Sequence, residues 1–314
     1  MHGAGFEVGQ ALVQHPLTKA VGFTGSFEGG KALFDLANQR KVPIPVFAEM
    51  GSVNPVFILP EKLATDTDGI AAMYAKSITQ SAGQFCTNPG LLISVKSQAL
   101  DMFKERLGDA IKVIPREKML HPGIAKSFHQ KRAAAIREGA RILAANDDGV
   151  NNTESIPTLA TTSATLFLSN HTLQQEVFGP YSLLVECDDL NEMLTVANGM
   201  EGQLTSTILA TPQEALNNAG LMEVLKEKCG RFIFNGVPTG VEVALGMHHG
   251  GPFPATTDSR FTAVGADGIK RFARPLCFQN WPDELLPAEL KNANPLQLWR
   301  TVNNVLTKES ISIP

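Results

Sequence analysis

Apolar segments of two kinds alternate along the first eighty residues and constrain the fold more than any other feature of the chain. Residues 19–24 and 46–50 are short apolar runs that predict strands. Residues 29–39 and 66–78 carry apolar side chains at helical spacing, and Asp66 is a suitable N-cap residue for the second helix. Parallel strands need long connections, which helices of this length supply. The pattern therefore predicts an α/β fold with a parallel sheet and crossover helices.

The rest of the 314-residue chain also contains both predicted helices and predicted strands. Apolar spacing predicts a helix over residues 100–111, and the alanine-rich segment 133–145 is also expected to be helical. Residues 146–155 read as a polar loop, and the last forty residues are expected to hold short helices interrupted by prolines. Further strands are predicted at residues 91–95, 181–185, 206–209 and 231–235.

Charge and cysteine usage exclude several classes of protein. Lys and Arg number 27 and Asp and Glu 31, a net charge of −4, so we expect no nucleic-acid partner. No apolar run approaches the roughly 18 residues of a transmembrane helix, and the first residues do not form a secretory signal. The four cysteines form no C-x-x-C pair, so we expect no metal site and a cytoplasmic location.

Cys86 lies in a loop of small residues, Ser81-Ala82-Gly83-Gln84-Phe85-Cys86, between a predicted helix and a predicted strand. Such a loop can present a thiol beside free backbone N–H groups, which activates the sulfur and stabilises an oxyanion. A buried, inert cysteine is the alternative, because free cysteines usually lie in cores.

Glu49 occupies the C-terminal end of a predicted strand, where open parallel sheets form their sites. Its neighbours Phe47 and Met50 are apolar, so the carboxylate could serve as a general base. The alternative is an ordinary solvated residue at the end of a strand. The sequence alone leaves both interpretations open.

Two further segments could contact a cofactor. In the first, Gly25 and Ser26 follow a strand and precede a helix, which is a typical anion site for a pyrophosphate, although Ser26 could simply cap the helix. In the second, Glu176 and Phe178 flank a turn before a strand, where a carboxylate could bind ribose hydroxyls and a ring could pack on a flat heterocycle. A plain turn is the alternative there.

These four segments, in this order, resemble the aldehyde dehydrogenase superfamily over essentially the whole chain. The C-terminal part, from His249-Gly250-Gly251-Pro252-Phe253-Pro254 to Arg274-Pro275-Leu276-Cys277, resembles the branch that contains α-ketoglutaric semialdehyde (2,5-dioxovalerate) and NADP-dependent fatty aldehyde dehydrogenases. The resemblance implies NAD(P)-dependent oxidation of an aldehyde to an acid, with Cys86 as nucleophile and Glu49 as the base that activates water.

The resemblance also implies where the NAD or NADP cofactor binds. Gly25 and Ser26 would lie at its pyrophosphate, the Met50 backbone near its carboxamide, and Glu176 and Phe178 at the nicotinamide ribose and ring. His249 falls where this branch has a histidine near the active site, with a structural role as the alternative. Arg260 is a candidate anchor for a substrate carboxylate, although a structural salt bridge is the simpler use of its guanidinium.

Family members are longer at the N-terminus, so we expect a partial Rossmann-type cofactor domain and an α/β catalytic domain. We assign residues 1–81 to the C-terminal part of the cofactor domain, 82–265 to the catalytic thiol domain, and 266–314 to a segment that packs back on the cofactor and oligomerisation region. The family implies a homo-oligomer in the complete enzyme. We also expect this chain to be a C-terminal fragment that shows little activity by itself.

Two other functions fit the residues. One is a cysteine enzyme that transfers acyl groups without redox chemistry, because the thioester half of the reaction needs no nicotinamide. The other is an inactive remnant that persists as an interaction module. Strong NAD(P)-dependent turnover would distinguish the dehydrogenase from both.

Overall fold

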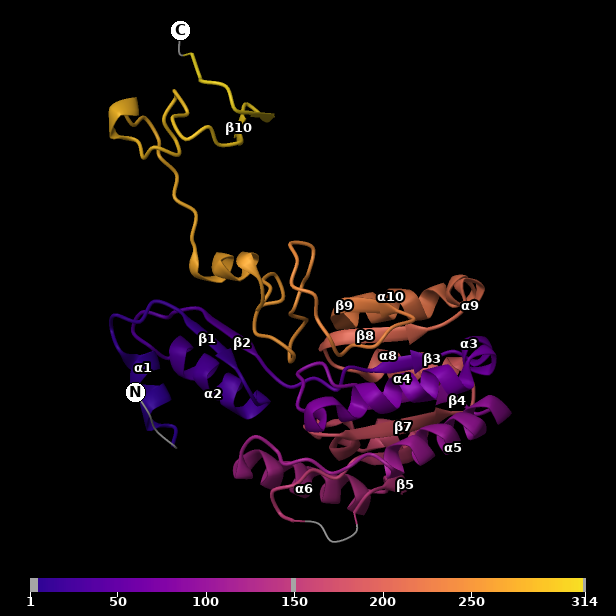
Figure 1. Ribbon diagram of the computed structural model, residues 1–314. Helices are drawn as coiled ribbons and strands as arrows, with labels where there is room; N and C mark the ends of the chain where they lie inside the picture. Colours follow the sequence, from indigo (N-terminus) through magenta and orange to yellow (C-terminus); the bar gives the residue numbers. More distant parts are fainter. Residues whose placement is uncertain (1–4, 148–150, 313–314) are drawn as a thin grey trace. The chain divides into compact units, whose positions relative to one another are not determined.

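Seven strands form the main sheet of the protein in the computed structural model, which describes residues 5–147 and 151–312. The strand order is β5-β6-β7-β4-β3-β8-β9, and every neighbouring pair except β5 with β6 is parallel (Figure 1). The strands are β3 (Val56–Ile58), β4 (Leu91–Val95), β5 (Arg141–Ala145), β6 (Thr158–Ser163), β7 (Tyr181–Cys187), β8 (Gln203–Leu209) and β9 (Cys229–Phe234).

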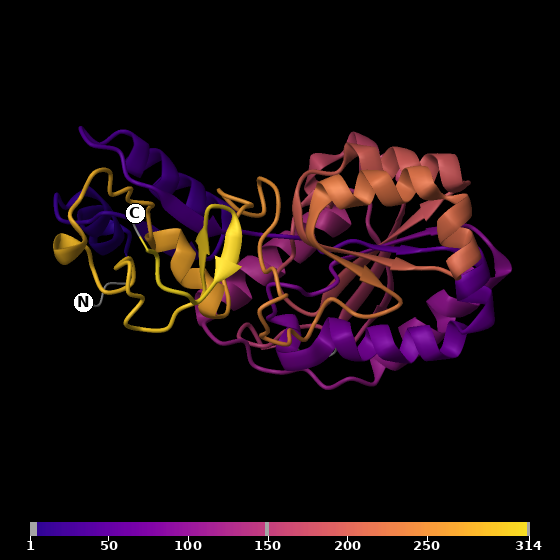
Figure 2. The same ribbon diagram turned by 90° about the horizontal axis from the view of Figure 1, so that it is seen from above.

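Helices cover both faces of this sheet, because its central strands are apolar on both sides. In β3, Phe57 packs into one core, while Val56 and Ile58 pack into the other. Figure 2 shows the purple helices on one side of the sheet and the orange helices on the other. The first core contains α6 (Pro122–Arg137), α7 (Ala164–Ser169), α8 (Leu190–Gly199) and α10 (Ala219–Lys228), and the second contains α3 (Pro60–Thr65), α4 (Thr67–Thr79) and α5 (Gln98–Lys112).

The N-terminal part of the chain forms a second, two-stranded parallel sheet. It consists of β1 (Val21–Thr24) and β2 (Val46–Glu49), in register from Val21 with Val46 to Thr24 with Glu49. The helices α1 (Glu7–Gln14) and α2 (Phe27–Asn38) contribute to its separate small core. Ser26 caps α2 by accepting a hydrogen bond from Gly29 N at 3.2 Å.

Most of the predicted strands are confirmed, but the helix predicted over residues 133–145 is right only as far as Arg137. There α6 ends at Arg137, Gly139 adopts a φ of +105°, and residues 141–145 form β5. A positive φ suits glycine and ends a helix, and pairing of β5 with β6 outweighs the helix propensity of alanine. The predicted loop at residues 146–155 includes residues 148–150, which lie outside the described residues.

The chain divides into two compact units, Met1–Arg271 and Phe272–Pro314. The smaller unit contains one short 3₁₀ turn (Asp283–Leu285) and an antiparallel hairpin of β10 (Arg300–Val302) and β11 (Val305–Thr307). The expectation of several short helices in the last forty residues is therefore largely wrong. The domain boundaries proposed near residues 82 and 265 stay predictions. Throughout the described ranges, none of the helices has both the length and the apolarity needed to span a membrane.

Candidate active site

Cys86 lies in the loop between a 3₁₀ turn, η1 (Gln80–Gly83), and β4, and its side chain is half-buried. Ser81, Ala82 and Gly83 all have positive φ values, of 52°, 55° and 64°. At Gly83 a glycine is required, because a Cβ there would collide with the backbone of Gly179. The loop that carries the thiol therefore packs directly against the Glu-x-Phe-Gly-Pro segment, from which it is far away in sequence.

Glu49 is the last residue of β2 and is only 5% exposed. Hydrogen bonds fix the backbone around it, since Met50 N donates to Ala255 O at 2.8 Å and Gly25 N donates to Glu49 O at 3.1 Å. Its placement at the C-terminal end of a strand agrees with the prediction. The expectation of a solvated carboxylate at this strand end is wrong.

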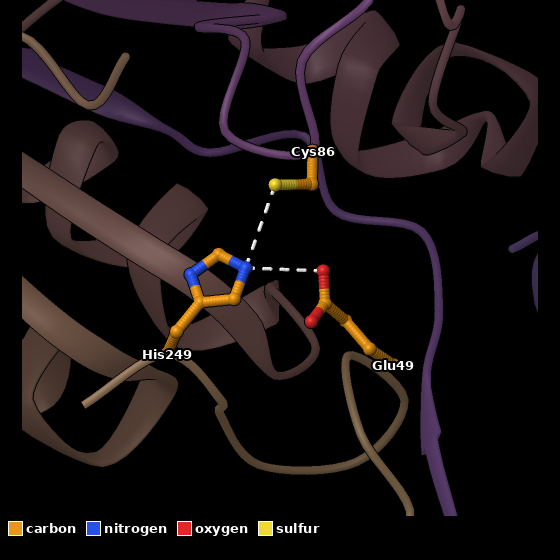
Figure 3. A group of neighbouring side chains, drawn as sticks. All are labelled: Glu49, Cys86 and His249. Atoms are coloured by element: carbon orange, nitrogen blue, oxygen red, sulfur yellow. Dashed lines mark hydrogen bonds and ion pairs between the residues drawn. The ribbon is translucent and has the colours of Figure 1, made fainter. Parts of the chain in front are cut away.

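His249 brings the thiol and the carboxylate together. Its Nε2 atom lies 3.4 Å from Cys86 Sγ and 3.1 Å from Glu49 Oε1, and both side chains point toward the ring (Figure 3). The backbone of His249 is held on both sides, because its N–H donates to Thr262 Oγ1 and its carbonyl accepts from Ala263 N. The C-terminal end of β2 thus meets the loop that precedes β4, and the three groups form one cluster.

The electrostatics of the cluster favour a protonated imidazole. The hydrogen bonds with Cys86 and then with Glu49 raise the pKa of His249 to about 9, although burial of the ring opposes this shift. At neutral pH the ring is therefore an imidazolium that donates from Nε2 toward both the sulfur and the carboxylate. A cation with donors at a thiol is the usual environment of a reactive cysteine.

Asn54, for which the sequence analysis proposed no role, fixes the backbone of the nucleophile loop. Its side chain is fully buried, and its Nδ2 donates to the carbonyls of Cys86 and Asn88, both at 2.9 Å. Its Oδ1 accepts from Ser52 Oγ at 3.1 Å and from Thr205 Oγ1 at 3.0 Å. The backbone N–H of Cys86 donates to no group among the described residues, so it is available to a bound oxyanion. The signal in the sequence was an asparagine directly before a proline, a pair that often marks a special backbone position.

A pocket of about 240 Å³ is lined by two of the predicted cofactor residues, Ser26 and Glu176, and by Gly51, which lies two residues after Glu49. Burial raises the pKa of Glu176 to about 7, against the opposing effect of Lys131. Gly51 keeps the space open, because a Cβ there would lie 2.7 Å from Oε2 of Glu176. Phe178 is half-buried and does not line the pocket.

The other predicted residues lie close to this region. Gly25 adjoins Ser26 and contacts Glu49 through its backbone, and Met50 is buried against Gly30 of α2. Arg260 does not join the cluster, because its guanidinium pairs with Asp258 at 2.6 Å on the surface. The predicted salt bridge of Arg260 is thus confirmed, and its use as a substrate anchor stays a prediction.

Fold and site together define an α/β protein in which a thiol, an imidazole and a carboxylate meet between the C-terminal end of β2 and the loop that precedes β4. The model of the aldehyde dehydrogenase family matches residues 1–256. The chain therefore belongs to the aldehyde dehydrogenase family.

Curated relatives and solved structures agree with this assignment. The chain is 46% identical over 306 residues to an alpha-ketoglutaric semialdehyde dehydrogenase of Acinetobacter baylyi. This alignment covers 97% of the chain and 58% of that protein. It is 44% identical to alpha-ketoglutaric semialdehyde dehydrogenase 2 of Azospirillum brasilense, over 95% of this chain and 57% of that protein. The chain thus spans somewhat more than half the length of these relatives.

Among solved structures, a Thermus 1-pyrroline-5-carboxylate dehydrogenase with bound NAD superposes with a TM-score of 0.70 at 22% identity, covering 85% of this chain and 52% of that one. Proline utilization A from Bdellovibrio bacteriovorus gives a TM-score of 0.73 at 23% identity, over 87% of this chain and 29% of that one. These likenesses confirm the predicted aldehyde dehydrogenase-like α/β fold.

Proposed function

We propose that this chain carries the catalytic residues of an NAD(P)-dependent aldehyde dehydrogenase that oxidises α-ketoglutaric semialdehyde to the acid. The observation that carries the proposal is the meeting of Cys86, Glu49 and His249, with atoms 3.1–3.4 Å apart, in a chain of the aldehyde dehydrogenase family. The choice of substrate rests on the names of the two relatives at 44% and 46% identity.

The first step is attack by Cys86 Sγ on the aldehyde carbon. His249 donates to the sulfur and so supports its thiolate form. As the carbon–sulfur bond forms, negative charge moves to the aldehyde oxygen. The free backbone N–H of Cys86 can donate to that oxygen. Asn54 keeps this N–H in place by binding the carbonyl of the same residue.

When bound, the nicotinamide of NAD or NADP would supply the hydride acceptor that oxidation of the aldehyde requires. We infer that NAD or NADP binds in the pocket lined by Ser26 and Glu176. Gly25, Met50 and Phe178, which do not line this pocket, stay proposed cofactor residues on the family resemblance. Glu176 suits this role because its raised pKa leaves it able to accept from, or donate to, ribose hydroxyls near neutral pH.

The second step is hydrolysis of the thioester on Cys86. Glu49 takes a proton from a water molecule, and the resulting hydroxide attacks the acyl carbon and releases the acid and the thiol. The buried carboxylate suits this role because the hydrogen bond to His249 orients it toward the sulfur. Both steps use the same three side chains.

We also propose the cytoplasmic location and the homo-oligomer expected from the sequence. All four cysteines are free thiols, which supports a reducing compartment. The fold of the unit Phe272–Pro314 leaves large apolar side chains exposed, including Trp281 and Trp299, so this unit offers surface that can pack against another copy or against the rest of the chain. Size-exclusion chromatography with light scattering tests this second proposal, and a monomer at working concentration contradicts it.

The proposed reaction is tested with a complete version of the enzyme that contains this chain. Formation of NADH or NADPH upon addition of α-ketoglutaric semialdehyde, lost in Cys86→Ser, is the expected result. Transfer of the acyl group to an added thiol or amine with no reduced nicotinamide would instead support the non-redox acyl-transfer enzyme. A lack of both activities would support the inactive remnant.

A further inference from the structure

Arg231 is a half-buried cation near the candidate nucleophile that the proposed reaction does not use. It is the third residue of β9. Among residues 5–147 and 151–312, no acidic side chain forms an ion pair with it. A charge that is partly removed from water without an acidic partner is costly, so this position favours binding of an anion.

Three contacts place Arg231 at the edge of the Cys86 site. In the sheet, Arg231 is in register with Thr205, whose hydroxyl binds Asn54, the residue that holds the Cys86 carbonyl. The preceding residue, Gly230, touches the backbone of Gly250 so closely that a Cβ would not fit. Gly250 directly follows His249. The backbone of Arg231 therefore lies between the segment that carries His249 and the strand that supports Asn54.

The segment after β9 forms the third contact. The guanidinium donates from Nη2 to Pro238 O at 2.5 Å and from Nη1 to Gly240 O at 3.4 Å. Thr239, between these two residues, is hydrogen-bonded to Ser77 Oγ at 2.7 Å, and Ser77 belongs to α4, the helix that leads into the Cys86 loop. Arg231 thus lies within a wall formed by β9, residues 238–240 and the end of α4.

The guanidinium of Arg231 has N–H groups that are not hydrogen-bonded. It has five N–H groups, of which two are bound to the carbonyls of Pro238 and Gly240, and its Nε is buried without a hydrogen-bond partner. Burial lowers the pKa of the Arg231 guanidinium, and the charge of Cys86 opposes this shift. Planar, forked donors of this kind match a carboxylate.

We propose that Arg231 binds the carboxylate of the aldehyde substrate, at the end of the molecule opposite to the carbonyl that reacts with Cys86. This inference rests on the proposed function. α-Ketoglutaric semialdehyde carries a carboxylate at that end, whereas a simple alkyl aldehyde does not. Arg231 is therefore the residue that selects acidic aldehydes over neutral aldehydes of the same length.

The test uses reversible addition of an aldehyde to Cys86, which requires neither cofactor nor turnover. The sulfur–carbon bond forms, the carbonyl π pair becomes the oxygen–hydrogen bond, and the thiol proton ends on that oxygen. Cys86 in this form no longer reacts with iodoacetamide. The protection of Cys86, measured by mass spectrometry on the 314-residue chain, reports binding of glutaric semialdehyde and of pentanal, which have the same chain length and differ in the carboxylate.

We expect glutaric semialdehyde to protect Cys86 at lower concentration than pentanal. In Arg231→Gln, the concentration of glutaric semialdehyde needed should rise about 10- to 100-fold, the effect of losing a hydrogen bond between charged groups. Protection by pentanal should change less than about twofold. Arg260→Gln, which removes an arginine paired with Asp258, is the matched control and should behave as wild type.

Each outcome decides between the proposals. If neither aldehyde protects a reactive Cys86, the proposed function fails. If both aldehydes protect wild type equally, or Arg231→Gln keeps the preference for the acidic one, the role of Arg231 is wrong while the proposed function stands. If Arg231→Gln does not fold, modification of wild type with phenylglyoxal decides, because glutaric semialdehyde must then protect Arg231 and leave Arg260 reactive.

Discussion

The Nε2 atom of His249 lies 3.4 Å from Cys86 Sγ, and the two residues are 163 positions apart in sequence. The same nitrogen lies 3.1 Å from Glu49 Oε1. The Nε2–H group thus faces two acceptors, the sulfur and the carboxylate. The ring can therefore stay hydrogen-bonded when negative charge moves from the sulfur to the substrate. The reactivity of Cys86 and the protonation of His249 should therefore change together.

We expect Cys86 to be the most reactive of the four thiols toward limiting iodoacetamide. Burial raises the pKa of Cys187 to about 12 and also raises that of Cys229, so both should react slowly. Cys277 is exposed but belongs to no such cluster. Mass spectrometry of the alkylated peptides measures the order. Faster labelling of Cys277 than of Cys86 in folded protein would contradict the assignment.

Replacement of His249 by Gln should slow alkylation of Cys86 by about tenfold near neutral pH, because a charged hydrogen bond to the sulfur is lost. His248→Gln is the matched control and should leave the rate unchanged.

The pKa of His249 is raised from 6.5 to about 9, so its contribution to stability is fully present below pH 6.5 and is lost as the pH rises through about 9.

Urea denaturation at several pH values tests the direction in which the stability contribution of His249 changes with pH. The free energy of unfolding of wild type should fall relative to that of His249→Gln between pH 6.5 and about 9. A difference between the two proteins that stays constant over this range would show that the ring is not protonated in the folded state.

The fold could be predicted largely from the sequence, because buried parallel strands are apolar on both faces and stand out as short runs. The strands Leu91–Val95 and Tyr181–Cys187 are examples. Prediction failed where pairing with distant residues decides the structure. Residues 141–145 are helix formers by composition, yet they pair with β6, which the sequence analysis did not identify.

The candidate site could be predicted only in part. The local surroundings of Cys86 and Glu49 made them candidates, and the family resemblance selected them. Their meeting at His249 depends on contacts such as the hydrogen bond from His249 N to Thr262, which no local pattern encodes. Asn54 was missed for the same reason, since its role follows from contacts with Cys86 and Thr205 in other parts of the chain. Arg260 was proposed as a substrate anchor because of its charge, whereas in the structure its guanidinium pairs with Asp258.

In a complete enzyme, Glu49→Gln should slow hydrolysis of the thioester much more than its formation, because an amide cannot take the proton of water. A burst of reduced nicotinamide followed by a slow steady state is the expected time course in rapid mixing. The steady-state rate should fall by about 10²- to 10⁴-fold, the usual contribution of a general base. Full steady-state activity of this variant would exclude Glu49 as the base.

Asn54→Ala should destabilise the protein by about 1–3 kcal/mol for each buried carbonyl that loses its partner. Asn54 also has a φ of 47°, which alanine adopts less readily than asparagine. Alkylation of Cys86 should slow as well, because the nucleophile loop loses its anchor. Asn38→Ala, at an exposed position of α2, is the control and should change stability by less than about 0.5 kcal/mol. Equal stability of the two variants in urea would contradict the role of Asn54.

The 314-residue chain tested without further sequence should show little NAD(P)-dependent oxidation of glutaric semialdehyde. Its candidate cofactor pocket has a volume of about 240 Å³, below the roughly 300–1,000 Å³ typical of ligand pockets, and a dinucleotide is a large ligand. The part of the chain that precedes Glu49 forms a sheet of only two strands, and such sheets are marginally stable by themselves.

Weak binding of the dinucleotide also removes the energy that orients the nicotinamide beside Cys86. The rate of NADH or NADPH formation by purified chain, with the thiol of Cys86 shown to be intact by alkylation, measures this directly. Addition of aldehyde should still protect Cys86, since the thiohemiacetal needs only the catalytic cluster. Turnover of about one per second or faster, within the usual range for enzymes, would show that the pocket formed by Ser26 and Glu176 is sufficient for the cofactor.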